Sequence, residues 1–134
     1  MSVVGRSLAP VMLAWIGDDR GRTWTIEIAE TRAERRRGLL GRAIIEPGTA
    51  MLFPNARSVH TLGMAFPISV VFLDRTSRVV GVERTPPGRR LVRRVRARHV
   101  LETTADADVR IGDRFDYRPR RRAISRRWIS DVPE

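Results

Sequence analysis

The chain has 134 residues, 42% of them hydrophobic, which is enough to bury the core of one domain. It contains no cysteine, so disulfides, thiolate zinc sites and cysteine nucleophiles are excluded. All 26 basic residues are arginine, and the formal net charge is +11. Such a surplus attracts nucleic acid, anionic lipid or acidic proteins, but arginines spread along a whole chain are also typical of solvated faces and of coding bias.

The first apolar segment, residues 8–16, is too short to span a bilayer, which needs about 20 apolar residues. It runs into Gly17, Asp18 and Asp19 without the small-residue cleavage pattern of a signal peptide. The sequence therefore predicts a strand here, no transmembrane segment and a cytoplasmic location.

Residues 11–16 and 23–30 flank a turn-rich stretch, which predicts a β-hairpin. In the second of these strands, Trp24, Ile26 and Ile28 alternate with polar residues. That alternation is typical of a strand with one buried face and one solvated face.

The hairpin is followed by the one predicted helix. Thr31 and Glu34 have the spacing of a capping box, in which each side chain accepts a hydrogen bond from a backbone N–H at the helix start. Gly38 and Gly41 weaken the helix late, so it is predicted near residues 32–41.

Three further strands are expected in the middle of the chain. Ala50–Phe53 is a compact apolar run that ends at a proline. Residues 67–73 show no polar alternation, which indicates a strand covered on both faces. A polar turn at residues 74–78 connects this strand to residues 79–82 and predicts a second hairpin.

The C-terminal third combines basic loops with short strands. Residues 89–98 hold six arginines and are predicted to be an exposed loop, residues 99–103 a strand, and residues 105–110 one helical turn. Asp113 is a charge on an otherwise apolar alternation, so its carboxylate needs an arginine or backbone N–H donors. Residues 119–134 are interpreted as an arginine-rich tail that follows a single domain of residues 1–118.

Three segments, in this order, are similar to motifs of one protein family. Residues 31–42 match a helix signature, Ala50–Phe53 matches a Gly-Met-Leu-Phe strand, and residues 60–69 match a turn that leads into an apolar strand. On these motifs the chain resembles the bacterial and archaeal family called domain of unknown function 192.

The resemblance implies a mainly β fold, either a small barrel or a jelly-roll-like sandwich of about 7–8 short strands with one helix. It implies no established chemistry. Ser69 stands where the family usually has an aspartate, so an acid–base role at this position is not carried over to the chain.

Residues 100–102 also match the family in order and spacing, and together with the three motifs they supply the candidate binding residues. Most of them gather in the segment from residue 60 to residue 67, and two lie elsewhere: His60, Thr61, Met64, Pro67, Arg42 and Glu102. The histidine can serve as a hydrogen-bonded packing group, a binding residue or an acid–base catalyst.

Metal, cofactor and catalytic motifs are missing from the sequence. The four candidate metal ligands lack the usual ligand spacing: His60, His99, Asp74 and Glu102. The sequence also lacks a phosphate loop, a dinucleotide fingerprint and a serine-nucleophile elbow. We therefore predict no catalytic residue, no metal and no cofactor.

The favoured interpretation is a non-enzymatic module that binds a small molecule or a protein near residues 60–67. The first alternative is association with nucleic acid through the arginine clusters at residues 89–98 and 118–127, with Tyr117 and Trp128 available for base stacking. The second cluster also has a faint amphipathic pattern suited to an anionic membrane surface. An enzyme of unidentified reaction is the second alternative.

Overall fold

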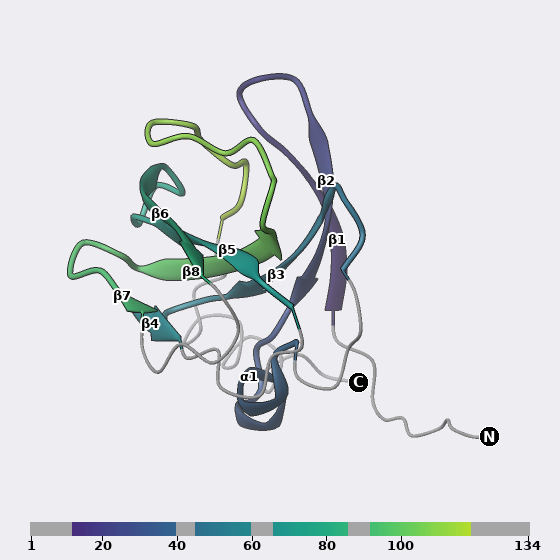
Figure 1. Ribbon diagram of the computed structural model, residues 1–134, viewed down its shortest axis with the longest axis vertical. Coiled ribbons are helices and arrows are strands. Elements are labelled where there is room, and N and C mark those ends of the chain that lie inside the picture. The colour runs from purple at the N-terminus through teal and green to yellow at the C-terminus, as the bar shows by residue number, and fades with distance from the viewer. Residues whose placement is uncertain (1–11, 40–44, 60–65, 86–91, 119–134) are drawn as a thin grey trace, which may run out of the picture.

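The computed structural model describes residues 12–39, 45–59, 66–85 and 92–118. They form a mainly β fold with one short helix (Figure 1). In chain order the elements are β1 (Met12–Gly17), β2 (Thr23–Ile28), α1 (Arg32–Arg37), β3 (Thr49–Phe53), β4 (Ser58–Val59), β5 (Ile68–Leu73), β6 (Val79–Thr85), β7 (Val92–Arg93) and β8 (His99–Thr104).

Six strands build one sheet in the order β1-β2-β3-β8-β5-β6, and β4 pairs with β7 in a separate small sheet. The predicted mainly β class with short strands and one helix is confirmed. The large sheet is open, with β1 and β6 at its edges, and does not close into a barrel.

The first hairpin is confirmed, and one carboxylate organises its tip. β1 and β2 pair in antiparallel fashion. The Asp18 side chain is fully buried. Its Oδ1 accepts hydrogen bonds from the backbone N–H groups of Arg20 and Arg22 at 2.9 and 3.0 Å, and its Oδ2 accepts from Arg22 Nε and Trp24 Nε1 at 2.8 and 2.9 Å. Burial acts to raise the pKa of Asp18, but these hydrogen bonds together hold the pKa below its ordinary value.

Arginines of the hairpin tip fasten the loop that follows β8. Arg20 pairs with Asp108 at 2.7 Å and with Asp113 at 2.9 Å. Arg22 Nη1 donates to the carbonyl of Asp108 at 2.7 Å. Asp113 also accepts a hydrogen bond from the backbone N–H of Arg110 at 3.0 Å. The predicted dependence of Asp113 on arginine and backbone donors is therefore confirmed.

After β2 the chain forms α1 and then returns to the sheet in parallel. The capping box is confirmed, because Thr31 Oγ1 and a carboxylate oxygen of Glu34 each accept the other residue's backbone N–H at 3.0 Å. α1 ends at Arg37, earlier than predicted, because Gly38 has φ 50° and ψ −131°, which no helix can continue. β3 then pairs parallel to β2. In the described part of the chain, no helix is long and apolar enough to cross a membrane.

β8 comes late in the sequence but lies inside the sheet, where it pairs antiparallel with both β3 and β5. β6 pairs with β5 in the predicted second hairpin. Because successive side chains on a strand point to opposite sides, the sheet has two faces, which we name by the residues Trp24 and Glu102 that they carry. β5 is buried on both faces, as predicted.

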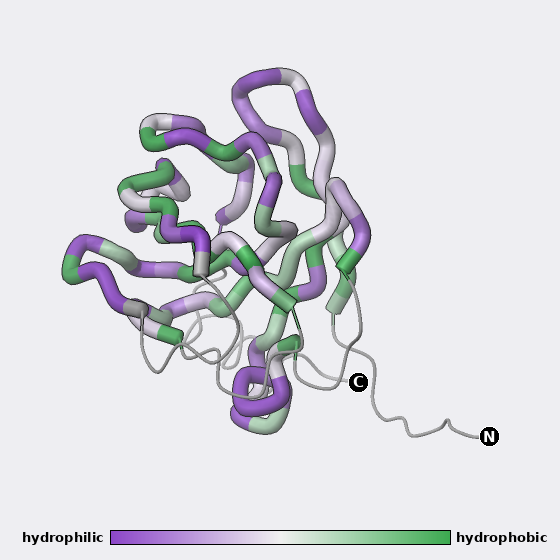
Figure 2. Tube along the Cα trace, in the orientation of Figure 1, coloured by the Kyte–Doolittle hydropathy of each residue, from purple (hydrophilic) through white to green (hydrophobic). Residues whose placement is uncertain are grey.

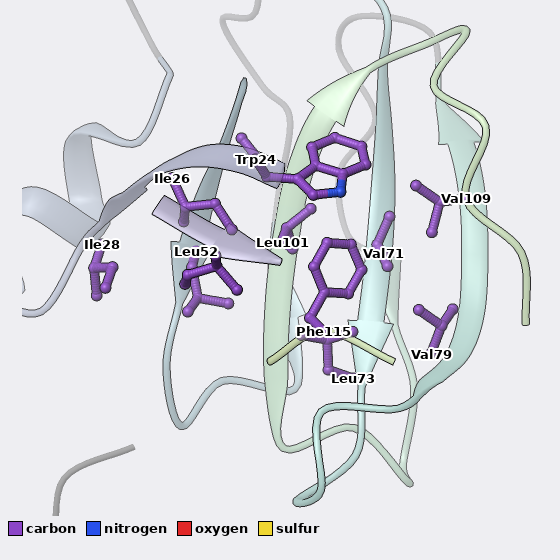
Figure 3. Close-up of a cluster of buried hydrophobic side chains, with 12 residues drawn as sticks. Trp24, Ile26, Ile28, Leu52, Val71, Leu73, Val79, Leu101, Val109 and Phe115 are labelled. Carbon is purple, nitrogen blue, oxygen red and sulfur yellow. The ribbon is translucent and has the colours of Figure 1, made fainter. Parts of the chain in front are cut away.

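The Trp24 face holds one hydrophobic core (Figure 3). The rings of Trp24 and Phe115 lie 5.5 Å apart with tilted planes. Aliphatic side chains from five strands surround these rings: Ile26, Ile28, Leu52, Val71, Leu73, Val79 and Leu101. Ala107 and Val109 also pack here. Residues 105–106 form a turn and residues 107–110 have no regular structure, so the predicted helical turn at residues 105–110 is wrong.

The Glu102 face carries a second core beneath the region of α1. Its buried apolar side chains come mainly from the central strands: Ala29, Leu39, Met51, Phe53, Ile68, Val70, Phe72, Ala97 and Val100. α1 itself buries no residue and is largely hydrophilic (Figure 2). Leu39, just past its end, is 2% exposed and anchors this segment to the core.

The segment predicted as an exposed basic loop is partly structured. β7 lies within it and pairs with β4. Ala97 is buried, and the guanidinium of Arg94 lies 5.2 Å from the centre of the Phe72 ring. The loop prediction is therefore wrong for β7, which is a strand, and for the buried Ala97, whereas the rest of residues 94–98 forms a largely exposed loop as predicted. Residues 89–91 lie outside the described part.

We expect Gly38→Ala to lower the free energy of unfolding by about 1–3 kcal/mol. The positive φ of Gly38 strains any other residue, and an added Cβ would lie 3.3 Å from Phe53 Cζ. Gly17→Ala is the matched control, because its added Cβ would make only an ordinary 3.7 Å contact with the carbonyl of Arg22. Urea unfolding of both variants measures the difference, and equal losses in both would contradict this account.

Candidate ligand-binding pocket

A pocket of about 190 Å³ opens on the Glu102 face, where the end of α1 meets the sheet. Four parts of the chain line it: the last turn of α1 and the residues after it, the end of β3, the segment that contains β4, and the middle of β8. The described lining residues are Arg35, Arg36, Arg37, Gly38, Leu39, Phe53, Ala56, Ser58, Val59 and Glu102.

Glu102 is the buried polar group of this pocket. On β8 it lies directly opposite Met51 of β3 and Val70 of β5, and both neighbours are apolar and buried. Glu102 is 3% exposed, and among the described residues none gives its carboxyl a hydrogen bond or an ion pair. Burial raises the pKa of Glu102 to about 8, so the carboxyl keeps its proton at neutral pH.

Three consecutive arginines lie at the solvent side of the pocket. Arg35, Arg36 and Arg37 are all exposed and form the last turn of α1. The guanidinium of Arg35 donates a hydrogen bond to the carbonyl of Pro54, which ties α1 to the end of β3. Since arginine stays charged at any physiological pH, the pocket has a positive margin and a neutral acid at its buried end.

The wall between these two ends is apolar. Leu39 and Phe53 are buried, and Ala56 and Val59 are partly buried against the same core. Gly38 lets the backbone pass close to the Phe53 ring, where a side chain would not fit without a shift. An apolar wall with a few convergent polar groups is typical of small-molecule sites.

The structure places two of the residues predicted for the site. Glu102 lines the pocket, whereas Pro67 is exposed just before β5 and is not part of the lining. The other four lie outside the described residues, so their roles stay predictions: Arg42, His60, Thr61 and Met64. The described lining reaches Val59, the residue directly before this predicted segment.

His99 does not converge with Glu102. It lies opposite Leu73 on the Trp24 face, on the other side of the sheet. Its Nδ1 accepts a hydrogen bond from the backbone N–H of Asn55 at 3.0 Å, and its ring meets Tyr117 edge-on at 5.4 Å. Burial lowers the pKa of His99, so the ring is neutral at physiological pH.

Asp74 and Ser69 make contacts that hold turns. Asp74 Oδ1 accepts from the backbone N–H and the hydroxyl of Thr76, both at 2.8 Å, and from the backbone N–H of Arg78 at 3.0 Å. Burial acts to raise the pKa of Asp74, but these bonds bring it below its ordinary value. Ser69 is fully buried, and its hydroxyl donates to the carbonyl of Ala105 at 3.0 Å. The position that usually holds an aspartate therefore joins β5 to the turn after β8.

The chemistry available in the pocket is limited. In its described lining Glu102 is the one acidic group, and no histidine accompanies it. The described part of the chain contains no group of three or more side chains placed to hold a metal ion. A lone protonated acid can donate a hydrogen bond or exchange one proton, but nucleophilic catalysis needs a nucleophile beside a base. The described lining therefore offers hydrogen bonding and exchange of one proton at Glu102.

Sequence reasoning missed most of the lining. The sequence pattern does not identify Arg35, Arg36, Arg37 or Val59 as site residues, and it places Phe53 only at the end of an apolar strand. One signal was present, because Glu102 is the single charged residue in the otherwise uncharged strand of residues 99–104, apart from its first histidine. A carboxyl buried in such a strand loses its hydrogen bonds to water, so its presence there indicates a structural or functional role.

Comparison with known proteins agrees with the motif resemblance. A UPF0127 protein of Thermococcus sibiricus is 30% identical over 112 residues, which cover 76% of this chain and 73% of that protein. The crystal structure of a Sinorhizobium meliloti protein, provisionally named as a transcription regulator, has a TM-score of 0.71 at 20% identity and covers 81% of this chain and 96% of that chain.

A protein of unknown function from Novosphingobium aromaticivorans has a TM-score of 0.69 at 18% identity and covers 87% of this chain and 99% of that chain. At these identities the two crystal structures show a shared fold alone. Residues 15–117 match the family DUF192, described as an uncharacterized ACR. The chain therefore belongs to the family called domain of unknown function 192.

Proposed function

We propose that this chain is a binding domain for a small organic molecule, held in the pocket on the Glu102 face, with no catalytic step of its own. The observation that carries the proposal is the Glu102 carboxyl, which is 3% exposed, borders a pocket and has no partner among the described residues. A hydrogen bond formed in such a pocket contributes about 0.5–1.5 kcal/mol net. A ligand that bonds to this carboxyl gains that contribution.

The size of the pocket limits the ligand. A cavity of about 150 Å³ engineered into another protein binds benzene, and the pocket here measures about 190 Å³. Compounds with on the order of six to ten non-hydrogen atoms therefore suit it. The walls formed by Leu39, Phe53 and Val59 favour a ligand with an apolar body.

Filling the pocket is expected to abolish binding. Ala56→Leu adds three carbons to a lining residue, whereas Ala33→Leu makes the same change on the exposed side of α1 and serves as the control. NMR titrations of the labelled chain with phenol, benzoate and indole measure binding through the amide shifts of residues 53, 59 and 102. We expect at least one compound to shift them at millimolar concentration in the unaltered chain and in Ala33→Leu, and none in Ala56→Leu. Absence of shifts in all three proteins, or equal binding in all three, would contradict the proposal.

Association with nucleic acid is the second candidate. It draws support from Arg93, Arg96 and Arg98, which are exposed in and after β7, while Arg94 is held against Phe72 and lies 3.4 Å from Glu83. Such binding would weaken steeply with salt because many phosphates are contacted, whereas a small ligand in the pocket would depend on salt much less. Binding in the pocket is favoured over nucleic-acid association because the Glu102 carboxyl has no hydrogen-bond partner among the described residues. Exposed arginines, in contrast, form hydrogen bonds with water.

A further inference from the structure

Building on the proposed function, we infer that the ligand is a small organic anion that carries a hydroxyl or carbonyl oxygen at the end opposite its negative charge. The inference follows from the two polar ends of the pocket, which differ in charge and in depth. Hydroxylated aromatic acids are the simplest compounds with this arrangement.

The buried end requires a neutral oxygen. Glu102 lies between Met51 and Val70, and among the described residues it receives no donor that would stabilise an ionised carboxylate. A protonated carboxyl donates through its O–H and accepts through its carbonyl oxygen, so it suits a neutral polar group, and a hydroxyl or carbonyl oxygen of the ligand can accept the donated hydrogen bond. A negative group placed here would meet apolar side chains and no cation, at a high desolvation cost.

The solvent side requires a negative group. Arg36 and Arg37 are exposed at the margin, and no described acidic residue forms an ion pair with either of them. The guanidinium of Arg35 donates to the carbonyl of Pro54 and keeps its positive charge beside them. An arginine guanidinium matches a carboxylate or phosphate with paired hydrogen bonds. A cationic ligand would be repelled at the mouth and would find a neutral acid inside.

An apolar wall of Leu39, Phe53 and Val59 lies between the two polar ends of the pocket. An aromatic ring suits this wall because Phe53 offers a ring against which it can stack or pack edge-on. A benzene ring with one carboxylate and one hydroxyl in para positions stays within the volume available. Free acids and the acidic ends of larger molecules share this chemistry, and the volume selects the free acids.

The test uses four probes that share one ring: 4-hydroxybenzoate, benzoate, phenol and 4-hydroxybenzylamine. Isothermal calorimetry or NMR titration gives their affinities for the full chain. We expect 4-hydroxybenzoate to bind most tightly, about five- to tenfold better than benzoate, which is the usual value of one hydrogen bond. The amine is expected to bind at least tenfold more weakly than the acid.

Variants assign the two ends. In Glu102→Leu the advantage of 4-hydroxybenzoate over benzoate should disappear, whereas Glu102→Gln should keep it because an amide can still donate. Arg36→Gln combined with Arg37→Gln should weaken both acids about tenfold and leave phenol unchanged. Thermal unfolding of each variant confirms that it is folded before its affinity is interpreted.

The possible results distinguish a failure of the inferred ligand class from a failure of the proposed function. If phenol or the amine binds as tightly as 4-hydroxybenzoate and Ala56→Leu still blocks binding, the pocket is a ligand site but the inferred ligand class is wrong. If the hydroxyl preference survives in Glu102→Leu, the role of Glu102 is wrong. If no probe binds to the unaltered chain, both the inferred class and the proposed function are overturned.

Discussion

Replacing Asp18 with asparagine is expected to lower the free energy of unfolding by about 3 kcal/mol at neutral pH. Four donors converge on the two oxygens of this fully buried side chain, two on each. In either orientation of an asparagine amide, its NH₂ group would face two donors instead of accepting from them. The change also removes the negative charge that pairs with Arg22.

The loss should depend on pH in a defined direction. The pKa of Asp18 is lower in the folded chain than in the unfolded chain, so its stabilising effect is complete above the unfolded value and fades as the pH falls through the folded value. We therefore expect the difference between the unaltered chain and Asp18→Asn to be constant from neutral pH down to about pH 5 and to shrink below about pH 4.

Urea unfolding at several pH values measures this difference. Asp116→Asn is the control, because Asp116 is exposed in the same part of the fold and donates only its backbone N–H, to the carbonyl of Gly17. It should change stability by less than about 0.5 kcal/mol. A similarly small effect of Asp18→Asn would show that the hairpin tip does not depend on this carboxylate.

Glu102→Gln is expected to have the opposite effect, stabilising the chain at alkaline pH. In the folded chain the Glu102 carboxyl keeps its proton up to about pH 8, whereas an unperturbed glutamate releases it near pH 4.5. Between these values the folded state binds more protons than the unfolded state, so raising the pH favours unfolding. The full difference corresponds to roughly 5 kcal/mol above pH 8, because the pKa rises from 4.5 to about 8 and each unit is worth about 1.4 kcal/mol.

The glutamine variant has no carboxyl to titrate, so its stability should lack this decline. The measurement compares free energies of unfolding for the unaltered chain and for Glu102→Gln from pH 5 to pH 9. Glu46→Gln, on an exposed turn, is the control and should follow the unaltered chain. Parallel curves for all three proteins would mean that the Glu102 carboxyl has a charge partner in the folded state.

Local features of the fold could be predicted because their causes lie within a few residues. The capping box needs only Thr31 and Glu34, and the buried side of β2 follows from the alternation of Trp24, Ile26 and Ile28. The residue at which α1 ends was harder to predict from the sequence. Its position depends on Gly38 turning to a positive φ beside the Phe53 ring, a contact made with a strand that the sequence does not pair with the helix.

Non-local pairing limited the prediction of the site. The sequence pattern places residues 99–103 on a strand, but nothing within that strand says that it lies between β3 and β5. That position surrounds Glu102 with Met51 and Val70 and brings it to the end of α1. Family motifs selected Glu102 as a candidate, but its burial and raised pKa come from neighbours about 30 to 50 positions away in the chain.

The place of β8 in the sheet also determines when the domain can fold during synthesis on a ribosome. Synthesis proceeds from the N-terminus, so the strands made before β8 include two groups of this sheet, β1-β2-β3 and β5-β6. Neither group contacts the other within the sheet. Each group ends in a free edge, on β3 and on β5, and free edges pair readily with other chains. Both edges stay open until residues 99–104 leave the exit tunnel and pair with them together. More than three quarters of the chain must therefore be translated before its sheet can be completed. Until then the open strand edges expose the chain to aggregation.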